Sequence, residues 1–337
     1  MIDFIKQLPK AELHVHIEGT LEPEHAFLIA QRNNISMKYK RPEDMVAAYN
    51  FHDLPSFLEI YYSGINVLRT ELDFYELTYA YLEQASANGI VYAEIFFDPQ
   101  AHTRREISFS TIINGITKAQ EIAKSRLTID SNLIMCFLRE LSVESAFEHL
   151  KMAESYLSKI IGVGLDSNEK NNPPIKFKEV FAKAKAMGLK VTVHCDVNQE
   201  NSIEHIRQAI EDIQADRIDH GINVLESNKL CAELINKNIG LTVCPVSNRY
   251  VVNSLTSKEI IQLLSQGIKV TINSDDPSYF NAYLNENLIL LQQEGKLTKE
   301  HIIQLVKNSF DISWISDNQK QYYFDLLQKT TIQAAEA

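Results

Sequence analysis

The stretch LKVTVHCDVNQENSIEHIRQAIEDIQADRIDHG, residues 189–221, predicts the architecture of this chain. Residues 189–195 and 217–221 are short β-rich runs that close on polar or small residues. Residues 202–213 between them have the apolar spacing of a helix. Since a strand, a helix and a second strand in succession form the unit of a parallel sheet, this stretch indicates an α/β protein.

The same unit recurs along the chain. Eight apolar runs can be counted, and they are apolar nearly throughout, as parallel strands buried on both faces are. They are residues 11–16, 90–97, 132–140, 160–166, 189–195, 217–221, 239–245 and 268–277. Helical patterns fill the gaps at 109–126, 176–188, 202–213, 228–238 and 256–267, and Gly188 and Gly267 end two of them. The repeat predicts a (β/α)8 TIM barrel, with an open doubly wound sheet as the alternative.

Two regions exceed the simple repeat. Residues 22–89 hold three or four helical patterns, which is more than one crossover needs. We therefore expect a helical insertion near the mouth of the barrel, able to act as a lid. Residues 283–337 predict extra helices after the last strand. Because no linker or low-complexity tract divides the chain, residues 1–337 are predicted to form a single domain.

Composition limits the classes of partner. The 44 acidic residues outnumber 33 basic ones, and a net charge of -11 disfavours nucleic acid. No apolar run approaches the roughly 20 residues of a membrane span, and residues 1–16 lack a signal or transit pattern. The four cysteines form no CxxC pair, so we expect reduced thiols in a cytoplasmic protein. The oligomeric state stays open.

Histidines and aspartates gather where the predicted strands end, which is the end that carries chemistry in a barrel. They are His14, His16, His194, His220, Asp275 and Asp276. Any one of these histidines alone would be explained as a hydrogen-bonded structural group. Together they indicate a metal site, because a random scatter rarely places them on strands one, five, six and eight.

Three imidazoles and one carboxylate suit a single Zn²⁺ ion, or Fe²⁺, with a position left open for water. The predicted ligands are His14, His16, His194 and Asp275. Such an ion lowers the pKa of water from about 15.7 to about 7, which makes hydroxide available. We expect His220 to orient or deprotonate that water, with Asp275 sharing the task, and Asp276 to accept a hydrogen bond from a substrate ring N–H.

Several motifs carry a resemblance to a known family. They are HVHIEGT (14–20), GLDSNEKNNPP (164–174), RIDHG (217–221), CPVSN (244–248) and INSDDPSYF (272–280). They resemble the adenosine/adenine deaminases of the amidohydrolase superfamily over essentially the whole chain. Residues 8–24, 92–103 and 273–287 look closer to the adenine deaminase branch than to the nucleoside deaminases.

The resemblance implies the reaction and the residues that perform it. The reaction is hydrolytic deamination of a 6-aminopurine, adenine to hypoxanthine and ammonia, with the metal ligands named above. His220 matches the water-activating histidine and Asp276 the residue that holds the purine, while Ser167 falls where the family contacts the purine edge. Glu18 replaces a shorter Asp that holds the ribose in nucleoside deaminases, and leaves less room for a sugar. The alternatives are another amino-heterocycle, an N6-substituted adenine, or a metal-binding relative with little or no activity.

One departure from the family pattern follows the fifth strand. The family reads H-A-G-E there, and its Glu protonates the purine ring nitrogen. This chain reads His194-Cys195-Asp196-Val197, and Val197 cannot donate a proton. Asp196 is our candidate for the missing catalytic acid. The alternatives are that it only braces the loop, or that Glu200 takes the role.

Other polar and aromatic residues are expected to be structural. Glu94 and Asp98 should brace or solvate the rim of the barrel. Arg139 and Glu140 should form a salt bridge, with a role near the pocket as the less favoured interpretation. Trp314 should pack in the core.

Overall fold

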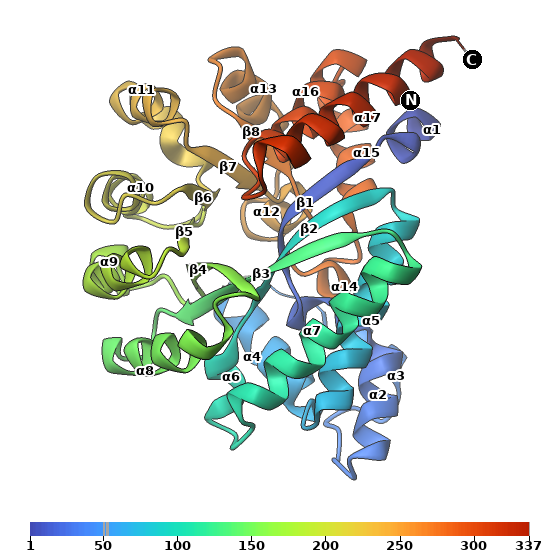
Figure 1. The fold of residues 1–337 in the computed structure, drawn as a ribbon, viewed down its shortest axis with the longest axis vertical. Helices are drawn as coiled ribbons and strands as arrows, with labels where there is room; N and C mark the ends of the chain where they lie inside the picture. Colours follow the sequence, from blue (N-terminus) through green and yellow to red (C-terminus); the bar gives the residue numbers. More distant parts are fainter. Residues whose placement is uncertain (50, 52–53, 337) are drawn as a thin grey trace.

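The computed structural model describes residues 1–49, 51 and 54–336 and contains eight parallel strands around a barrel (Figure 1). The strands are β1 Lys10–His16, β2 Ile90–Phe97, β3 Asp130–Leu138, β4 Ile160–Asp166, β5 Lys190–Cys195, β6 Arg217–His220, β7 Gly240–Val243 and β8 Val270–Ile272. Each strand pairs in parallel with the next along the chain, from β1 with β2 to β7 with β8. The predicted strand runs are therefore confirmed.

Irregular hydrogen bonds close the barrel between β8 and β1. The Asp275 N–H donates to the His14 carbonyl at 3.1 Å, and the His16 N–H donates to the Asp275 carbonyl at 3.0 Å. Next to these contacts, toward the start of both segments, the Asn273 side chain accepts the Leu13 N–H at 2.8 Å. Sequential strand order together with this seam confirms the TIM barrel and excludes the open doubly wound sheet.

Residues 22–89 form helices, as predicted, but only part of this segment is an insertion. It comprises α2 Pro23–Arg32, α3 Pro42–Ala47, α4 Leu54–Gly64 and α5 Glu71–Ala87. Helix α5 packs on β2 and on α7 (Phe109–Arg126), so it is the ordinary crossover helix of the barrel. The insertion proper is therefore α2 to α4, which lie together beyond one end of the strands (Figure 1).

The remaining helices cover the outside of the barrel. Between the later strands lie α9 Lys178–Ala186, α10 Ser202–Arg207, α11 Asn228–Lys237 and α13 Ser257–Ser265, as predicted. The extra C-terminal helices are α15 Leu284–Gly295, α16 Lys299–Asp311 and α17 Asp317–Glu336. Helix α16 packs against β1 and β8 and completes the helical layer at the seam.

A buried ion pair lies inside the barrel. A guanidinium nitrogen of Arg217 lies 2.5 Å from Glu94 Oε2, and both side chains are fully buried. The same guanidinium stacks over the Trp314 ring at 4.2 Å from its centroid. Gly162 makes room for this ring, because a Cβ there would lie 2.4 Å from it. Trp314 therefore packs as expected, but the expectation for Glu94 was wrong: it lies inside the barrel, paired with arginine, and not on a rim.

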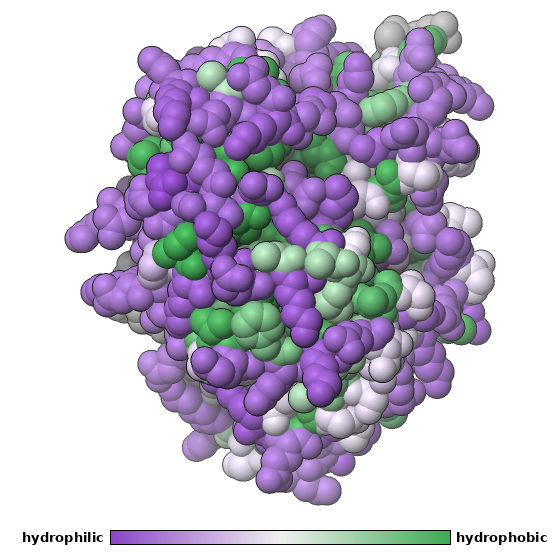
Figure 2. Space-filling view, turned by 60° about the vertical axis from the view of Figure 1, so that its left-hand side comes forward, coloured by the Kyte–Doolittle hydropathy of each residue, from purple (hydrophilic) through white to green (hydrophobic). Residues whose placement is uncertain are grey.

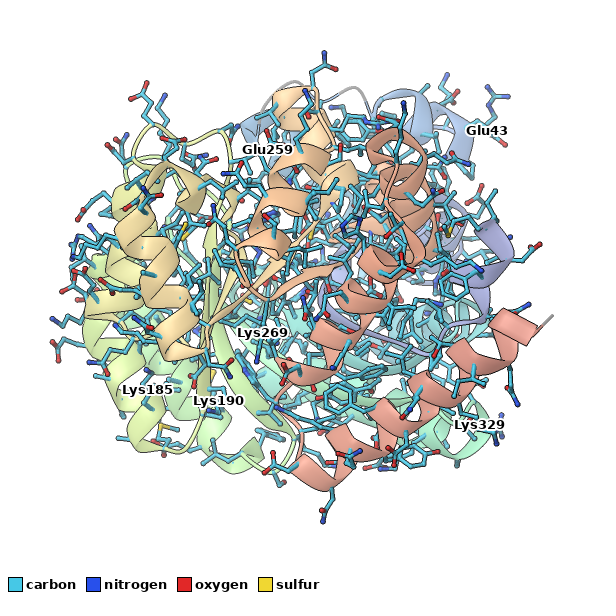
Figure 3. All side chains as sticks on the ribbon, turned by 90° about the horizontal axis from the view of Figure 1, so that it is seen from above. Glu43, Lys185, Lys190, Glu259, Lys269 and Lys329 are labelled. Carbon is cyan, nitrogen blue, oxygen red and sulfur yellow. The ribbon has the colours of Figure 1, made fainter. Side chains whose placement is uncertain are left out.

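The face of the molecule drawn in Figure 2 is mainly hydrophilic. Figure 2 shows one face on which hydrophobic side chains appear only in scattered clusters. Charged side chains such as Glu43, Lys190 and Lys329 are exposed, and Figure 3 shows side chains projecting around the outline of the molecule. Within the described ranges, no helix has the length and apolar character that crossing a bilayer requires.

Candidate active site

Strained backbone marks the strand ends that carry the predicted site. Ser167, His220 and Asp275 adopt left-handed conformations with φ of 70°, 60° and 67°. Non-glycine residues seldom do so, and such strain is concentrated at functional sites. Each residue ends a strand or follows one, so its side chain leaves the regular alternation of the sheet.

The four predicted metal ligands meet at one point. One ligand atom each of His14, His16, His194 and Asp275 lies within 4.8 Å of all the others, and all four residues are buried. Asp275 Oδ1 is 3.1 Å from His14 Nε2 and 3.5 Å from His16 Nε2. His16 Nε2 and His194 Nε2 face each other at 3.1 Å. Three imidazole nitrogens and a carboxylate oxygen converging in this way fit a divalent cation, which accepts all their lone pairs.

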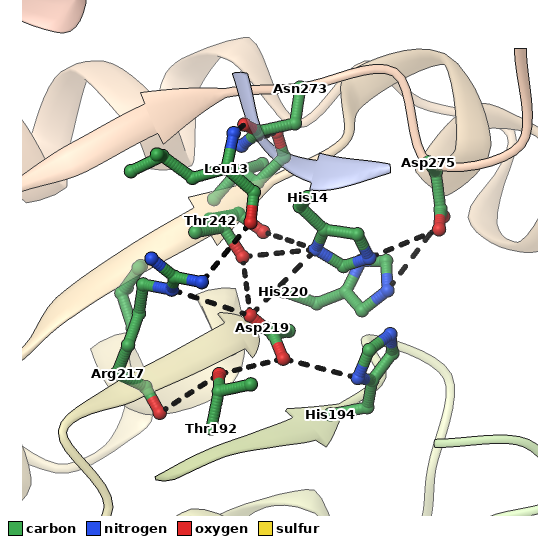
Figure 4. A network of polar contacts seen from close by, with 12 residues as sticks. Leu13, His14, Thr192, His194, Arg217, Asp219, His220, Thr242, Asn273 and Asp275 are labelled. Atoms are coloured by element: carbon green, nitrogen blue, oxygen red, sulfur yellow. Dashed lines mark hydrogen bonds and ion pairs between the residues drawn. The ribbon is translucent and has the colours of Figure 1, made fainter. Parts of the chain in front are cut away.

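A buried carboxylate orients two of these histidines from behind (Figure 4). Asp219 Oδ2 lies 3.2 Å from His194 Nδ1 and accepts the Thr192 hydroxyl at 2.7 Å. Asp219 Oδ1 accepts the Thr242 hydroxyl at 2.8 Å, and Thr242 Oγ1 is 2.9 Å from His14 Nδ1. Both imidazoles therefore have Nδ1 engaged and Nε2 directed at the ligand cluster. Such partners fix ligand orientation and raise metal affinity.

The protonation preferences of the histidines follow from burial and from this carboxylate. Burial lowers the pKa of His14 and that of His16, which favours the neutral imidazole that a metal requires. Burial acts in the same direction on His194, but the hydrogen bond and charge of Asp219 outweigh it and raise the pKa of His194 to about 9. A cation bound at Nε2 would take the place of that proton.

A cavity of about 830 Å³, counted out to its mouth, opens above the ligand cluster. One wall is aromatic and apolar, and it includes Phe57, Tyr61 and Tyr62 from α4 and Tyr250 and Phe280 from later elements. The floor is acidic, formed by Asp98, Asp166, Asp196, Asp275 and Asp276. A planar, nitrogen-rich ring suits such a cavity, because its faces pack on the aromatic wall and its N–H groups meet carboxylates.

His220 and Asp196 form a pair beside the ligand cluster. His220 Nε2 lies 3.3 Å from Asp196 Oδ1 and 3.8 Å from Asp275 Oδ2. Asp196 reaches the cavity without further movement of the loop, and burial raises its pKa. Val197 also lines the cavity, whereas Glu200 is exposed and does not. The geometry favours Asp196 over Glu200 as the acid.

A buried network holds the loop that carries Asp196. The Asp196 N–H donates to Glu169 Oε2 at 3.0 Å, and Glu169 Oε1 lies 2.6 Å from His205 Nδ1. Arg139 donates to the His194 carbonyl at 2.9 Å and lies 3.5 Å from Glu169. The prediction that Arg139 forms a salt bridge with Glu140 was therefore wrong. Arg139 instead pairs with the buried Glu169 and holds the backbone at His194.

Asp276 lies at the cavity floor with an unused acceptor. Its Oδ1 is buried and has no hydrogen-bond partner among the described residues, and burial raises its pKa. Gly19 permits this placement, because a Cβ there would lie 1.9 Å from Asp276 Oδ1. The free oxygen is available to a ring nitrogen of a substrate.

Ser167 and Glu18 differ in how they relate to the cavity. Ser167 lines it, donating its hydroxyl to Glu140 Oε1 at 3.0 Å, with the Tyr62 hydroxyl 3.0 Å away. Glu18 is fully buried and does not line it. Its Oε1 accepts the Asp98 N–H at 3.1 Å and lies 2.9 Å from His102 Nε2, and burial raises its pKa to about 7. Glu18 thus acts on the cavity only through its neighbours.

Three acidic residues of the site were not among those singled out. Asp219 precedes His220 in RIDHG, and Asp166 precedes Ser167 in GLDS. Both therefore lie within motifs that carry the family resemblance, and that resemblance was the signal that could have identified them. Asp166 Oδ2 lies 3.5 Å from His16 Nδ1, on the side of the ring away from the ligand cluster. Asp98 was assigned to a structural rim but lines the cavity, so that interpretation was wrong.

Known proteins resemble the chain over nearly its full length. The sequence pattern of the adenosine deaminase family matches residues 9–330. A protein named adenine deaminase from Crocosphaera subtropica is 50% identical, over 96% of this chain and 99% of its own. The crystal structure of adenine deaminase from Arthrobacter aurescens superposes with a TM-score of 0.92 at 38% identity, over 96% of this chain and 98% of that one. An amidohydrolase from Burkholderia ambifaria with bound Zn has the same fold, with a TM-score of 0.91 at 22% identity, over 100% of this chain and 95% of that one.

Proposed function

Because the chain belongs to the adenosine deaminase family, we propose that it catalyses the hydrolytic deamination of adenine to hypoxanthine and ammonia. The observation that carries this proposal is the convergence of three histidines and Asp275 on the floor of a cavity that also presents His220, Asp196 and Asp276. Relatives that are named adenine deaminase and are 48–50% identical to this chain support adenine, and not a nucleoside, as the substrate.

The ligand set suits one divalent ion per chain, and we propose zinc, with Fe²⁺ as the alternative. The Zn-bound amidohydrolase of the same fold is consistent with this choice. When bound, such an ion acidifies water and so supplies a nucleophile at neutral pH. His14, His16, His194 and Asp275 would hold it.

The chain's own residues would then move the protons. His220 accepts a proton from the attacking water, whose oxygen bonds to C6 of the ring. Asp196 is placed to give a proton to the ring nitrogen next to C6, and Asp276 holds the ring by a hydrogen bond. Breaking the bond from C6 to the exocyclic nitrogen then releases ammonia, with its third hydrogen supplied from the proton that His220 took up. The remaining hydrogen of the added water leaves the C6 oxygen as the 6-oxo group forms, and it restores the proton that Asp196 gave to the ring. Water and adenine are consumed, and hypoxanthine and ammonia are formed.

The test is to mix the purified protein, with its metal content measured, with adenine and follow the ultraviolet spectrum. We expect a shift to the spectrum of hypoxanthine, one ammonia per adenine, and about one zinc or iron per chain. A protein loaded with metal that leaves adenine unchanged would contradict the proposal. It would favour another amino-heterocycle, an N6-substituted adenine or a silent relative.

A further inference from the structure

Asp98 presents an acceptor in the cavity that the steps above do not use. The residue is 3% exposed, its side chain lines the cavity, and its Oδ1 has no hydrogen-bond partner among the residues that the structure describes. A buried acceptor left unpaired costs about 1–3 kcal/mol, so such atoms are normally matched by water or a ligand. We therefore expect Asp98 Oδ1 to accept a hydrogen bond from a donor group of the substrate.

The position of this carboxylate is fixed by its surroundings. The Asp98 N–H donates to Glu18 Oε1 at 3.1 Å, and its carbonyl accepts the Ala101 N–H at 3.0 Å. Helix α6 (Pro99–Thr103) begins directly after it. The backbone of Asp98 is thus held on both sides of its Cα, which fixes the point at which its side chain leaves the chain.

The neighbouring carboxylates have other tasks. Asp166 turns one oxygen toward His16 Nδ1 at 3.5 Å, which orients a metal ligand from behind. Asp275 belongs to the ligand set, Asp196 pairs with His220, and Asp276 adjoins Asp275. Asp166 Oδ1 and Asp276 Oδ1 also lack partners among the described residues, but Asp166 orients His16 and Asp276 holds the ring in the steps above, so Asp98 is the carboxylate of the floor to which no task has been assigned.

A free aminopurine carries a hydrogen on its five-membered ring that the nucleoside lacks. In the nucleoside a sugar replaces the hydrogen at N9, so that nitrogen cannot donate. We propose that Asp98 selects the free base over its nucleoside by accepting a hydrogen bond from this ring N–H. The inference rests on the proposed function, and it assigns to Asp98 the discrimination that the length of Glu18 alone was expected to provide. Glu18 contributes as a positioning residue that holds the Asp98 backbone.

The test compares adenine with 9-methyladenine, in which a methyl group replaces the N9 hydrogen. The parent should prefer adenine in kcat/KM by about 10³-fold, because a site built around a hydrogen bond rejects a ligand that cannot form it. Asp98→Leu keeps nearly the same shape but offers no acceptor. We expect it to lower kcat/KM for adenine by about 10–100-fold. Its rate with 9-methyladenine and its metal content should be unchanged, so that the preference shrinks by the same factor.

Tyr62→Phe is the matched control, since it removes another polar group of the cavity wall and should affect both substrates equally. Should Asp98→Leu fail to fold, Asp98→Ser is judged by the same ratio. Turnover of adenine without preference over 9-methyladenine, or a preference as large in the variants as in the parent, would overturn the inference and leave the deaminase proposal standing. A parent that does not turn over adenine would instead remove the proposed function, and this inference with it.

Discussion

At the residue scale, we expect Asp219 to govern how firmly two of the candidate histidine ligands are oriented. It contacts His194 directly and reaches His14 through Thr242. In Asp219→Asn, we expect zinc affinity to fall by about 10–100-fold, because an amide carries no charge and supports the two imidazoles less well. Competition with a coloured chelator measures the affinity.

Asp216→Asn is the control for this experiment, because Asp216 lies just before the same strand but at its opposite end, where it accepts the Val191 N–H at 2.9 Å. It should bind zinc like the parent. Equal zinc affinity in Asp219→Asn and the parent would show that the histidines need no support from this carboxylate.

Asp196 is expected to act as the catalytic acid that the family supplies from a glutamate one position later. Asp196→Asn keeps the size of the side chain but has no acidic proton to give. Activity with adenine should fall by at least about 10²-fold while the metal stays bound. Steady-state kinetics with elemental analysis of the same sample measures both. An unchanged rate would assign Asp196 to bracing the loop.

Val197 offers the converse experiment. Its side chain lines the cavity, and its carbonyl accepts the Asn223 side-chain N–H at 2.9 Å, so this loop is held in place. Val197→Glu restores the carboxyl at the family's position, and we expect adenine turnover to rise. Val197→Gln, which has the same length without an acid, should give no gain. A rise in both variants would point to a change of loop shape and not to proton transfer.

At the element scale, helix α4 of the insertion forms a wall of the cavity and is tied to the strand end opposite. Phe57 stacks on Phe280 with ring centroids 5.4 Å apart, and the Tyr62 hydroxyl lies 3.0 Å from Ser167 Oγ after β4. In the chain, α4 is more than a hundred residues from either partner. The insertion therefore completes a cavity that the barrel alone leaves open.

The hydrogen bond from Tyr62 should matter for closure over the substrate more than for the chemical step. Tyr62→Phe removes one bond worth about 0.5–1.5 kcal/mol, so KM for adenine should rise by about 2–10-fold with kcat nearly unchanged. Steady-state kinetics separates the two constants. A loss confined to kcat would instead place the hydroxyl near the reacting atoms.

At the scale of the whole molecule, the barrel depends on a seam between its first and last strands that has few regular hydrogen bonds. Asn273 accepts the Leu13 N–H at 2.8 Å, and Ser274 donates its N–H and hydroxyl to Glu12 Oε1 at 3.0 and 2.6 Å. The Tyr81 hydroxyl from α5 donates to the other oxygen of Glu12 at 2.7 Å. Side chains thus replace part of the strand ladder just below Asp275.

Asn273→Ala should destabilise the protein by about 1–3 kcal/mol, because the Leu13 N–H is left buried without a partner. Urea unfolding measures the free energy of unfolding. Asn114→Ala on the exposed side of α7 is the control and should stay within about 0.5 kcal/mol of the parent. Equal stability of the two variants would mean that the seam does not need this bond.

The sequence by itself determined the barrel and brought the four candidate metal ligands together. The strand and helix patterns are local, and parallel strands bring their carboxyl ends to one side of the molecule. Residues at the ends of β1, β5 and β8 therefore had to meet, although His16 and Asp275 lie near opposite ends of the sequence.

Only the tertiary structure decided which other carboxylates face the site. Strand alternation would send Asp219 and His220 to opposite sides, but the left-handed backbone at His220 turns its ring back toward the cluster. Glu18, expected to contact the substrate, faces Asp98 and His102, while Asp98 faces the cavity. These directions depend on the short 3₁₀ helix at Glu18–Thr20 and on packing between separate loops. Neither the 3₁₀ helix nor the packing between loops produces a periodic pattern that could be recognised in the sequence.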